Sequence, residues 1–528
     1  MEVILSFFRM AHIGLFFTAI GLLAISTIFF SCRREGVALF TLFLCALALR
    51  LFMVYQDAFL HEWDEQFHAL VARNMMDNPL KPVLKSIGLT GYDPFCWSNS
   101  HVWLHKQPLF LWQMALSMKV FGVSEFAIRY PAALMGALMV VMLFSITKTV
   151  TESRRTAFAA AVIFCFSGFQ LELISGQRGM DHNDVAFGFY VLASLWAYVC
   201  YCRDKRVLYA MLIGLFAGCA VLNKWLTGLV VFAPWVINML LAARGGRRKR
   251  EILHVVLALA ICTLVFVPWQ VYIFQAFPVE ARFEYDYNVK HLSEVVEGHE
   301  GSNFYYIDHF AEYFGEIGWF LLPAGFVLLL PSVRKRSSVH REAGVALVAV
   351  FVIIFFFFSY MVRSKLSAYF FVAAPVGVAF IAVAVRELYG QFSRGGYKQS
   401  GAVVLGMLVV VICVSALNPE LIIKEHNPKD KGRVARAAQT RLYKRMRSML
   451  PGGTKVMLNA HNMEDIQVMF YNKGVDAYVG LVANDKIDSL QNAGATIAAF
   501  AAGPLPELPV SLMRYRNLCL VARDDSRY

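Results

Sequence analysis

Long apolar runs separated by short polar connections dominate the chain up to residue 420. A helix needs about 20 mostly apolar residues to cross the hydrocarbon core of a membrane. By that criterion we count about twelve candidate spans, at 11–31, 36–55, 130–149, 156–173, 185–202, 207–223, 226–243, 252–274, 316–331, 343–361, 367–386 and 400–418. The pattern predicts an all-α polytopic membrane domain with larger polar loops at 56–129 and 275–315.

The composition supports a membrane protein. The 528 residues are 58% hydrophobic and 16% charged, with a mean hydropathy of +0.53, whereas soluble domains carry about 25% charged residues. The formal net charge of +13 does not indicate nucleic-acid binding, because the basic residues form short clusters between apolar runs. The ten cysteines show no paired Cys-x-x-Cys spacing and mostly lie in apolar runs, so we expect no disulfide framework.

The distribution of Lys and Arg predicts the orientation of the spans. One set of short connections, including Arg33-Arg34 and 244–250, holds roughly twenty basic residues, and the opposite set holds roughly four. Cytoplasmic loops of membrane proteins carry this excess of positive charge. We therefore expect both termini and the loops 56–129 and 275–315 on the extracytoplasmic side.

The first large loop opens with a helical pattern. Phe67, Leu70 and Val71 follow the i, i+3, i+4 spacing of an amphipathic helix, which we expect to lie along the membrane interface. Asn78-Pro79 ends this helix, because the residue before a proline disfavours helical backbone. A second helix is predicted over 108–120.

The composition changes near the C-terminus. We assign 1–420 to a transmembrane domain and 421–528 to an extracytoplasmic α/β domain. In the latter, short apolar runs at 455–461, 475–480, 495–501 and 517–523 alternate with helical patterns at 463–471 and 484–492. A basic helix precedes them, with Arg433, Arg436, Arg441, Lys444, Arg445 and Arg447. Anionic lipid headgroups, or solvent alone, are the alternatives for its surroundings.

Charged residues gather near the outer ends of the predicted spans. They are Asp64, Glu65, Lys106, Arg178, Asp181, Asp184, Lys224, Arg363 and Lys365. Charges at membrane depth are costly and usually functional. The acids could activate an acceptor, and the cations could hold a phosphate and stabilise it as it leaves. Helix capping by the acids and snorkelling by the lysines are the structural alternatives.

Three histidines in the 275–315 loop are candidates for a metal site. His291, His299 and His309 lie among Asp and Glu residues, and these residue types can ligate a divalent cation. Hydrogen bonding within the loop is the interpretation we favour. We therefore predict no definite cofactor and keep a divalent metal as an alternative.

An ordered set of motifs resembles a known family. The run HEWDEQFHALVARNM is followed by a proline-containing turn, by HKQPLFLW and by FGVSEFAIRYPAAL. Later segments read GLFAGCAVLNKWLTGLVVFAPW, KHLSEVVEGHEGSNFYY and RSKLSAYFFVAAP. From Leu44 to Pro375 the chain resembles the polyprenyl-phosphate-sugar-dependent glycosyltransferases of the C-type membrane fold. This family includes the protein O-mannosyltransferases and the lipid A aminoarabinose transferase.

The resemblance implies roles for particular residues. Asp64 would be the acid near the reacting hydroxyl of the acceptor. Lys106, Arg363 and Lys365 would hold the phosphate of a lipid-linked monosaccharide donor, and transfer would invert the anomeric carbon of the sugar. A further match is an exterior loop with a His and a Tyr-Tyr pair, here including His299 and Tyr305.

The chain departs from the family pattern at two places. Gln107 stands where the family's Lys-Pro-Pro-Leu element has its first proline, which leaves the shape of that loop open. Gln66-Phe67 stands where some members carry Arg-Tyr, so the phosphate contact made there is absent or comes from another residue.

We therefore predict an integral membrane glycosyltransferase. It would transfer a monosaccharide from a polyprenyl phosphate to a lipid, glycan or protein acceptor on the extracytoplasmic face. A transporter or flippase of a lipid-linked sugar, or a ligase of whole glycans, are the alternatives. The expected location is the bacterial inner membrane, with the C-terminal domain outside, and the expected partners are the donor, the acceptor and membrane lipids but no nucleic acid.

Overall fold

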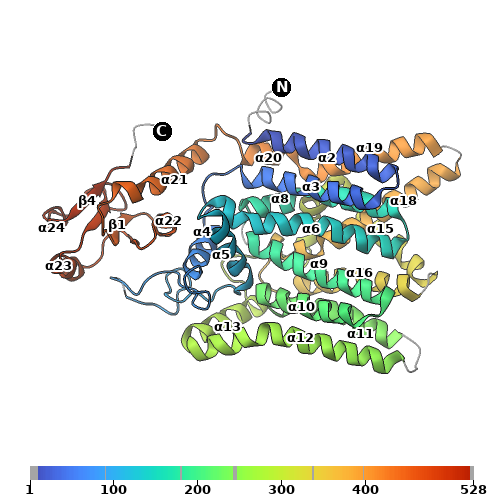
Figure 1. Cartoon of the computed structure of the whole chain (residues 1–528), viewed down its shortest axis with the longest axis horizontal. Helices are drawn as coiled ribbons and strands as arrows, with labels where there is room; N and C mark the ends of the chain where they lie inside the picture. The colour runs from blue at the N-terminus through green and yellow to red at the C-terminus, as the bar shows by residue number, and fades with distance from the viewer. Residues whose placement is uncertain are drawn as a thin grey trace. The chain divides into compact units, whose positions relative to one another are not determined.

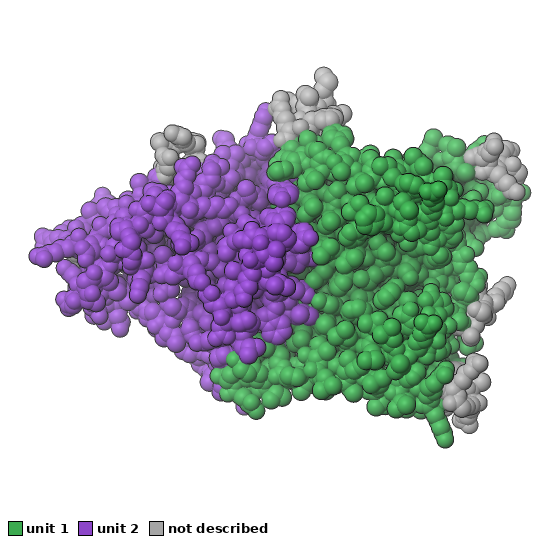
Figure 2. All heavy atoms as spheres, in the orientation of Figure 1, with its two compact units in different colours: residues 1–54, 132–276, 285–425 green, residues 55–131, 277–284, 426–528 purple. Residues whose placement is uncertain are grey.

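The computed structural model describes residues 10–89, 91–178, 181–241, 247–335, 338–395 and 398–523. The chain forms two compact units, drawn in different colours in Figure 2. We call residues 1–54, 132–276 and 285–425 the bundle unit, and residues 55–131, 277–284 and 426–528 the mixed unit.

Helices, most of them long and apolar, make up the bundle unit and lie side by side (Figure 1). They are α2 (Ile13–Ser31), α3 (Glu35–Val54), most of α6 (Glu125–Thr151), α7 (Arg154–Cys165), α8 (Gly168–Ser175), α9 (Asp181–Asp204), α10 (Val207–Lys224), α11 (Phe232–Leu241), α12 (Arg247–Ala276), part of α13 (Pro278–Ser293), α15 (Phe310–Lys335), α16 (Ser338–Phe356), α18 (Ala374–Arg394), α19 (Lys398–Leu417) and α20 (Pro419–Glu425). Shorter pieces are η1 (Trp225–Val231), α14 (Tyr305–Asp308), η2 (Phe357–Met361), α17 (Ser367–Phe370) and η3 (Phe371–Ala373).

The described helices account for a multi-pass membrane protein. Ten of them are long and apolar enough to cross a membrane, and the count is eleven if the bent pair α7–α8 forms one span. All twelve apolar runs seen in the sequence are mainly helical over the residues that the structure describes. The predicted fold class, a helical membrane domain followed by a small α/β domain, is confirmed.

The run at 226–243 differs from the prediction of a full span. It is a 3₁₀ helix, η1, that continues into α11, and the apolar helix Leu226–Leu241 is shorter than the ten spans. Gly228 allows a close approach to α10, because a Cβ added there would lie 2.7 Å from the Cβ of Ala220. The chain therefore turns closely against α10 before it continues as an α-helix.

The run at 156–173 bends by 41° between α7 and α8. Arg50 on α3 is fully buried and donates from Nη1 to the carbonyl of Cys165, 3.3 Å away, and from Nη2 to Gln170. A cation is favourable at the C-terminal end of a helix, where carbonyl groups lack helical partners. Arg50 therefore stabilises the break in this span.

Glycines let the bundle helices approach closely. A Cβ at Gly214 of α10 would lie 2.2 Å from the carbonyl oxygen of Ala258 on α12. A Cβ at Gly325 of α15 would lie 1.8 Å from the carbonyl oxygen of Phe380 on α18. Small residues at such contacts are typical of helix packing in membranes, where dispersion contacts replace the hydrophobic effect.

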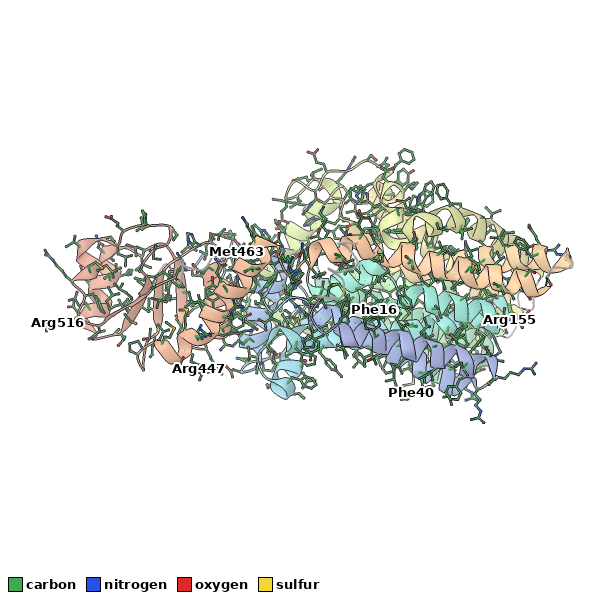
Figure 3. The ribbon with its side chains drawn as sticks, turned by 90° about the horizontal axis from the view of Figure 1, so that it is seen from above. Phe16, Phe40, Arg155, Arg447, Met463 and Arg516 are labelled. Carbon is green, nitrogen blue, oxygen red and sulfur yellow. The ribbon has the colours of Figure 1, made fainter. Side chains whose placement is uncertain are left out.

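The mixed unit combines the first loop with the C-terminal domain. Its helices are α4 (Asp64–Met75), α5 (Leu109–Phe121), α21 (Lys431–Met449), α22 (Glu464–Tyr471), α23 (Asn484–Asn492) and α24 (Val510–Met513). The predicted helices at the start of the loop and over 108–120 are therefore present. Helix α4 packs against both α5 and α22. Side chains such as Arg447 on α21 project into solvent (Figure 3).

The C-terminal domain contains a small parallel sheet. Its strands are β1 (Val456–Ala460), β2 (Asp476–Val479), β3 (Ile497–Phe500) and β4 (Leu518–Val521), in the spatial order β2-β1-β3-β4. They match the four apolar runs of the sequence. A core that includes Leu458, Ile497 and Leu512 fills one face. The first loop contacts this domain, because Lys85 lies 2.8 Å from Asp465 and the hydroxyl of Ser86 donates to Asp476 at 2.6 Å.

Candidate active site

Asp64 and Lys106 form an acid–cation pair in the mixed unit. Oδ1 of Asp64 lies 3.8 Å from Nζ of Lys106 and 3.9 Å from Nε2 of His68. Asp64 occupies the first turn of α4, where the helix dipole favours a negative charge. The side chains of Asp64 and Lys106 are 21% and 11% exposed, so a ligand can reach both charges.

Glu65 has different surroundings from its neighbour. It is 1% exposed and accepts hydrogen bonds from Nε and Nη2 of Arg129 at 2.6 and 2.8 Å. It also accepts from the backbone N–H of His61 at 2.7 Å. Arg129 in turn donates to the carbonyls of Asp57 and Phe59. These contacts hold the turn before α4 and give Glu65 a positioning role.

A buried cluster around Asp57 joins the start of the first loop to the C-terminal segment. Oδ2 of Asp57 lies 3.2 Å from Nε2 of His61 and 2.8 Å from Nδ1 of His426, and Arg433 donates to Oδ1. Burial would raise the pKa of Asp57, but the hydrogen bonds from His426 and His61 outweigh it and hold the pKa well below its usual value.

Helix α22 supports α4 from the C-terminal domain. Arg73, near the end of α4, donates to the carbonyl of Met469. Tyr471 donates its hydroxyl to Glu125 at 2.6 Å, and Lys444 lies 2.7 Å from the same carboxylate. Glu125 is one turn before Arg129 on α6, so these contacts and the Arg129–Glu65 pair belong to one network.

The bundle unit contains a second acid–cation pair, Asp184 with Lys224. Asp184 on α9 is 2% exposed, and Nζ of Lys224 lies 4.5 Å from the centre of the Tyr369 ring. An ammonium group over an aromatic face is attracted by the quadrupole of the ring. Asp181 begins α9, but its side chain lies outside the described residues.

Arg178 is held by acids and an aromatic ring. It pairs with Glu172 and lies 2.7 Å from Glu312, and its guanidinium lies 4.6 Å from the centre of the Phe169 ring. Burial would lower the pKa of Arg178, but the charges of Glu172 and Glu312 outweigh burial and raise it. With both acids engaged in this way, Arg178 is suited to fixing the loop before α9.

Lys365 and Arg363 differ in what their side chains contact. Lys365 is 4% exposed and donates to the carbonyls of Phe358, Ser359 and Val362 at the end of η2. Because an ammonium group has three N–H donors, these contacts use all of them. Burial and the nearby Arg363 lower the pKa of Lys365. Arg363 is exposed, so of the two it is the better placed to meet a ligand phosphate.

The backbone of this segment holds the exterior loop. The N–H of Arg363 donates to the carbonyl of His291 at 3.1 Å, and the N–H of Lys365 donates to the carbonyl of His299 at 2.9 Å. The rings of Tyr305 and His309 stack with 4.1 Å between their centres. Burial and the charge of Glu312 raise the pKa of Tyr305. Among the described residues, no group of three His, Cys, Asp or Glu could hold a metal ion.

The predicted site residues thus form separate groups within each unit. Asp64 and Lys106 meet in the mixed unit, and Asp184 and Lys224 meet in the bundle unit. The site residues predicted from the sequence do not include His68, Arg129 and Tyr369, which contact Asp64, Glu65 and Lys224. All three lie within the family motifs quoted above, and the i, i+4 spacing of Asp64 and His68 was a further signal.

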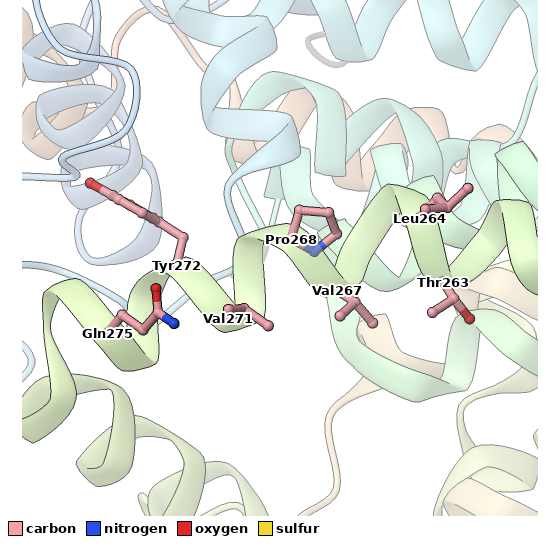
Figure 4. A pocket seen from close by; sticks show the side chains of 7 residues that line it. All are labelled: Thr263, Leu264, Val267, Pro268, Val271, Tyr272 and Gln275. Carbon is pink, nitrogen blue, oxygen red and sulfur yellow. The ribbon is translucent and has the colours of Figure 1, made fainter.

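An apolar groove lies along one face of α12 and has a volume of about 480 Å³ (Figure 4). Its lining consists of Thr263, Leu264, Val267, Pro268, Val271, Tyr272 and Gln275. These residues carry no charge and include none of the site candidates, so we assign no chemistry to the groove.

Comparison with known proteins agrees with the motifs. Residues 105–272 match the family model described as dolichyl-phosphate-mannose-protein mannosyltransferase. An undecaprenyl phosphate-alpha-4-amino-4-deoxy-L-arabinose arabinosyl transferase of Pseudomonas fluorescens is 23% identical over 279 residues, which cover 49% of this chain and 45% of that protein. One from Proteus mirabilis is 24% identical over 322 residues, which cover 59% and 54%. The chain spans about half the length of the curated relatives it matches.

Two solved structures share the fold. ArnT from Cupriavidus metallidurans bound to undecaprenyl phosphate has a TM-score of 0.61 at 15% identity, covering 85% of this chain and 86% of its own. The oligosaccharyltransferase AglB from Archaeoglobus fulgidus has a TM-score of 0.56 at 13% identity, covering 84% and 64%.

These comparisons agree with the helical membrane fold. The chain shares the fold of ArnT and AglB and is similar in sequence to polyprenyl-phosphate-sugar-dependent glycosyltransferases. The resemblance inferred from its motifs is confirmed.

Proposed function

We propose that the protein is an integral membrane glycosyltransferase. It transfers a monosaccharide from a polyprenyl phosphate to a lipid, glycan or protein acceptor on the extracytoplasmic face. The observation that carries the proposal is the accessible pair of Asp64 and Lys106, 3.8 Å apart at the start of α4. Relatives named arabinosyl transferases of an undecaprenyl phosphate sugar support it.

In the proposed mechanism Asp64 is the general base. It takes the proton of the acceptor hydroxyl, whose oxygen attacks the anomeric carbon of the sugar from the side opposite the phosphate. The bond between that carbon and the phosphate oxygen breaks, and the lipid phosphate leaves with the electron pair. Cations stabilise the departing charge most strongly where water is excluded. Lys106, beside Asp64, is the proposed contributor in the mixed unit, and Lys224 and Arg363 remain predicted phosphate-binding residues of the bundle unit.

Other predicted residues receive positioning roles in the proposal. Glu65 holds the backbone before Asp64 through Arg129, and Lys365 holds the segment that carries Arg363. Asp184 orients Lys224, and Arg178 holds the loop before α9. Asp181, His299 and Tyr305 remain predicted site residues without an assigned step.

The proposal also includes location and domain organisation. We propose the bacterial inner membrane, with the first loop and residues 421–528 outside and the short basic connections in the cytoplasm. The excess of positive charge on one set of connections supports this orientation.

The test is a transfer assay with purified protein and a panel of undecaprenyl-phosphate-linked monosaccharides, with envelope lipids, glycans and peptides as acceptors. Asp64→Asn should lower turnover about 10²- to 10⁴-fold, the usual contribution of a general base. Asp77→Asn is the matched control, because Asp77 is 62% exposed and pairs with exposed Lys473.

Near-normal turnover of Asp64→Asn would remove this residue from the mechanism. Movement of the lipid-linked sugar across sealed vesicles without transfer would favour a flippase instead. Accumulation of a whole transferred glycan would favour a ligase.

A further inference from the structure

Trp63, the residue before Asp64, has an unusual backbone conformation. Its φ and ψ are 66° and −117°, a region that glycine enters freely and that a bulky L-residue rarely adopts. Its carbonyl accepts from the N–H groups of Gln66 and Phe67 at 3.1 and 3.2 Å, so the first turn of α4 holds the conformation. Strain of this kind is concentrated at functional sites.

The Trp63 side chain is displayed at the surface. It is 54% exposed, although it is the neighbour of an acid in the candidate site. Its ring lies 6.4 Å from the half-buried ring of Trp97, at an angle of 51°. The strained backbone therefore presents an indole beside Asp64 and next to a second indole.

Ring contacts, one ion pair and two sequence neighbours connect the two indoles to the acid–cation pair. Trp97 stacks on His105 at 4.6 Å with an interplanar angle of 11°. His105 precedes Lys106, which lies 3.8 Å from Asp64, and Asp64 follows Trp63. The aromatic surface and the two charges thus border the same small area of the mixed unit.

Other side chains pack around the stacked rings of Trp97 and His105. The rings of Phe67 and Trp97 pack edge-to-face, with 5.1 Å between their centres. The rings of buried Trp103 and His105 also pack edge-to-face, with 5.7 Å between their centres. Nδ1 of His105 lies 3.1 Å from Glu284. Burial and the charge of Lys106 lower the pKa of His105, which favours a neutral ring at pH 7. The stack is therefore fixed before a ligand arrives.

We propose that Trp63 and Trp97 form a platform for the pyranose ring that carries the acceptor hydroxyl, and hence that the acceptor is a carbohydrate. This inference rests on the proposed function and narrows its acceptor. A pyranose has one face of C–H groups, which packs on the electron-rich face of an aromatic ring, while its hydroxyls point outward from the ring edge. Asp64 then meets a hydroxyl at that edge. A Ser or Thr side chain offers no flat C–H face of this kind.

A second explanation for an exposed tryptophan is anchoring at the membrane interface, where Trp is enriched. Anchoring requires neither the strained backbone of Trp63 nor the fixed stack of Trp97 on His105. Phe121 on α5 provides a control for this explanation. It is 48% exposed in the same unit and packs edge-on against Phe126 and Tyr130.

The kinetic test compares Trp63→Ala, Trp63→Phe and Phe121→Ala with the wild type. Trp63→Ala should raise the KM for the acceptor about three- to tenfold, the range expected for loss of an aromatic contact, and leave the donor KM within about twofold. Trp63→Phe should be intermediate, and Phe121→Ala should match the wild type. A change in donor KM alone, or equal effects of Trp63→Ala and Phe121→Ala, would overturn the proposal.

A binding test does not depend on turnover. Saturation-transfer NMR of the detergent-solubilised full chain uses methyl pyranosides in one arm and Ser- and Thr-containing peptides in the other. We expect signals from the ring C–H protons that Trp63→Ala removes and Phe121→Ala retains. Unchanged signals in Trp63→Ala, or signals from the peptides only, contradict the platform.

The two tests separate the platform from the proposed function. Pyranoside signals that depend on Trp63 in a protein with no transfer activity would support the platform and reject the transferase. Transfer to peptides with no pyranoside signal would support the transferase and reject the platform. If Trp63→Ala fails to fold, Trp63→Phe and Trp97→Phe take its place, because each keeps an aromatic ring. Their acceptor KM and pyranoside signals are then compared with those of the wild type.

Discussion

Asp64 and Glu65 are adjacent carboxylates with different surroundings. Asp64 is partly exposed beside Lys106, whereas Glu65 is buried and accepts three hydrogen bonds from Arg129 and His61. A base must reach the proton that it removes, so accessibility favours Asp64. The sequence identified the pair but not this division, because the partner Arg129 is separated from Glu65 by 64 positions.

Glu65→Gln tests the structural part of this division. It removes the countercharge of fully buried Arg129, and breaking a buried ion pair typically destabilises a protein by about 3–5 kcal/mol. We expect a clear fall in the thermal unfolding temperature of the purified protein. Asp64→Asn is the matched control and should unfold near the wild-type temperature.

The contrary result would be Glu65→Gln protein that unfolds like the wild type but has lost turnover. Glu65 would then be a catalytic residue, as the sequence analysis allowed.

At the scale of elements, α4 is held at both ends by segments distant in sequence. The Arg129–Glu65 pair holds its first turn, and Arg73 near its last turn contacts α22 of the C-terminal domain. The apolar spacing of α4 predicted the helix but not these supports. Periodicity reports which face of a helix is apolar, and it does not identify the segment that covers that face.

The Asp57 cluster predicts a pH dependence of stability. Because the folded-state pKa of Asp57 lies well below its usual value, the charged form contributes stability above the unfolded-state pKa of about 3.9, and this contribution is lost as the pH falls through the folded-state pKa. We expect wild-type protein to be more stable than Asp57→Asn at pH 7 and the difference to shrink below about pH 4.

Denaturant unfolding of both proteins from pH 7 to pH 2.5 measures this difference. Subtracting one curve from the other removes the titration of carboxylates common to both. Asp77→Asn, at an exposed ion pair, should differ little from the wild type at any pH. A wild-type advantage that persists unchanged into acid would exclude Asp57 as its source.

At the scale of the whole molecule, low identity accompanies a shared fold. Solved structures at 13% and 15% identity match this chain with TM-scores of 0.56 and 0.61. A membrane tolerates many apolar substitutions so long as each span keeps its length and its internal hydrogen bonds. The order of the spans is therefore preserved while most side chains differ.

The proposed orientation predicts the labelling of cysteines. Cys32 is exposed beside Arg33-Arg34 on a connection proposed to be cytoplasmic, and Cys96 lies in the first loop, proposed to be outside. In variants that keep a single cysteine, a membrane-impermeant maleimide added to spheroplasts should label Cys96 and not Cys32. Cys32 should react after the membrane is permeabilised, and the opposite pattern would invert the orientation.

The sequence by itself determined the helical membrane class, the positions of the apolar runs, the helices of the first loop and the four strands of the C-terminal domain. It could do so because bilayer thickness and backbone hydrogen bonding act on each segment separately. Only the tertiary structure decided that Glu65 and Lys365 make hydrogen bonds within the protein. It alone also decided that the span at 156–173 bends next to Arg50 and that Trp63 adopts a strained conformation beside Asp64. Glu65 and the bend depend on Arg129 and Arg50, which folding brings from distant positions and which no local pattern identifies. Lys365 and Trp63 contact residues within seven positions, but the residue types alone do not specify the backbone conformation that makes those contacts.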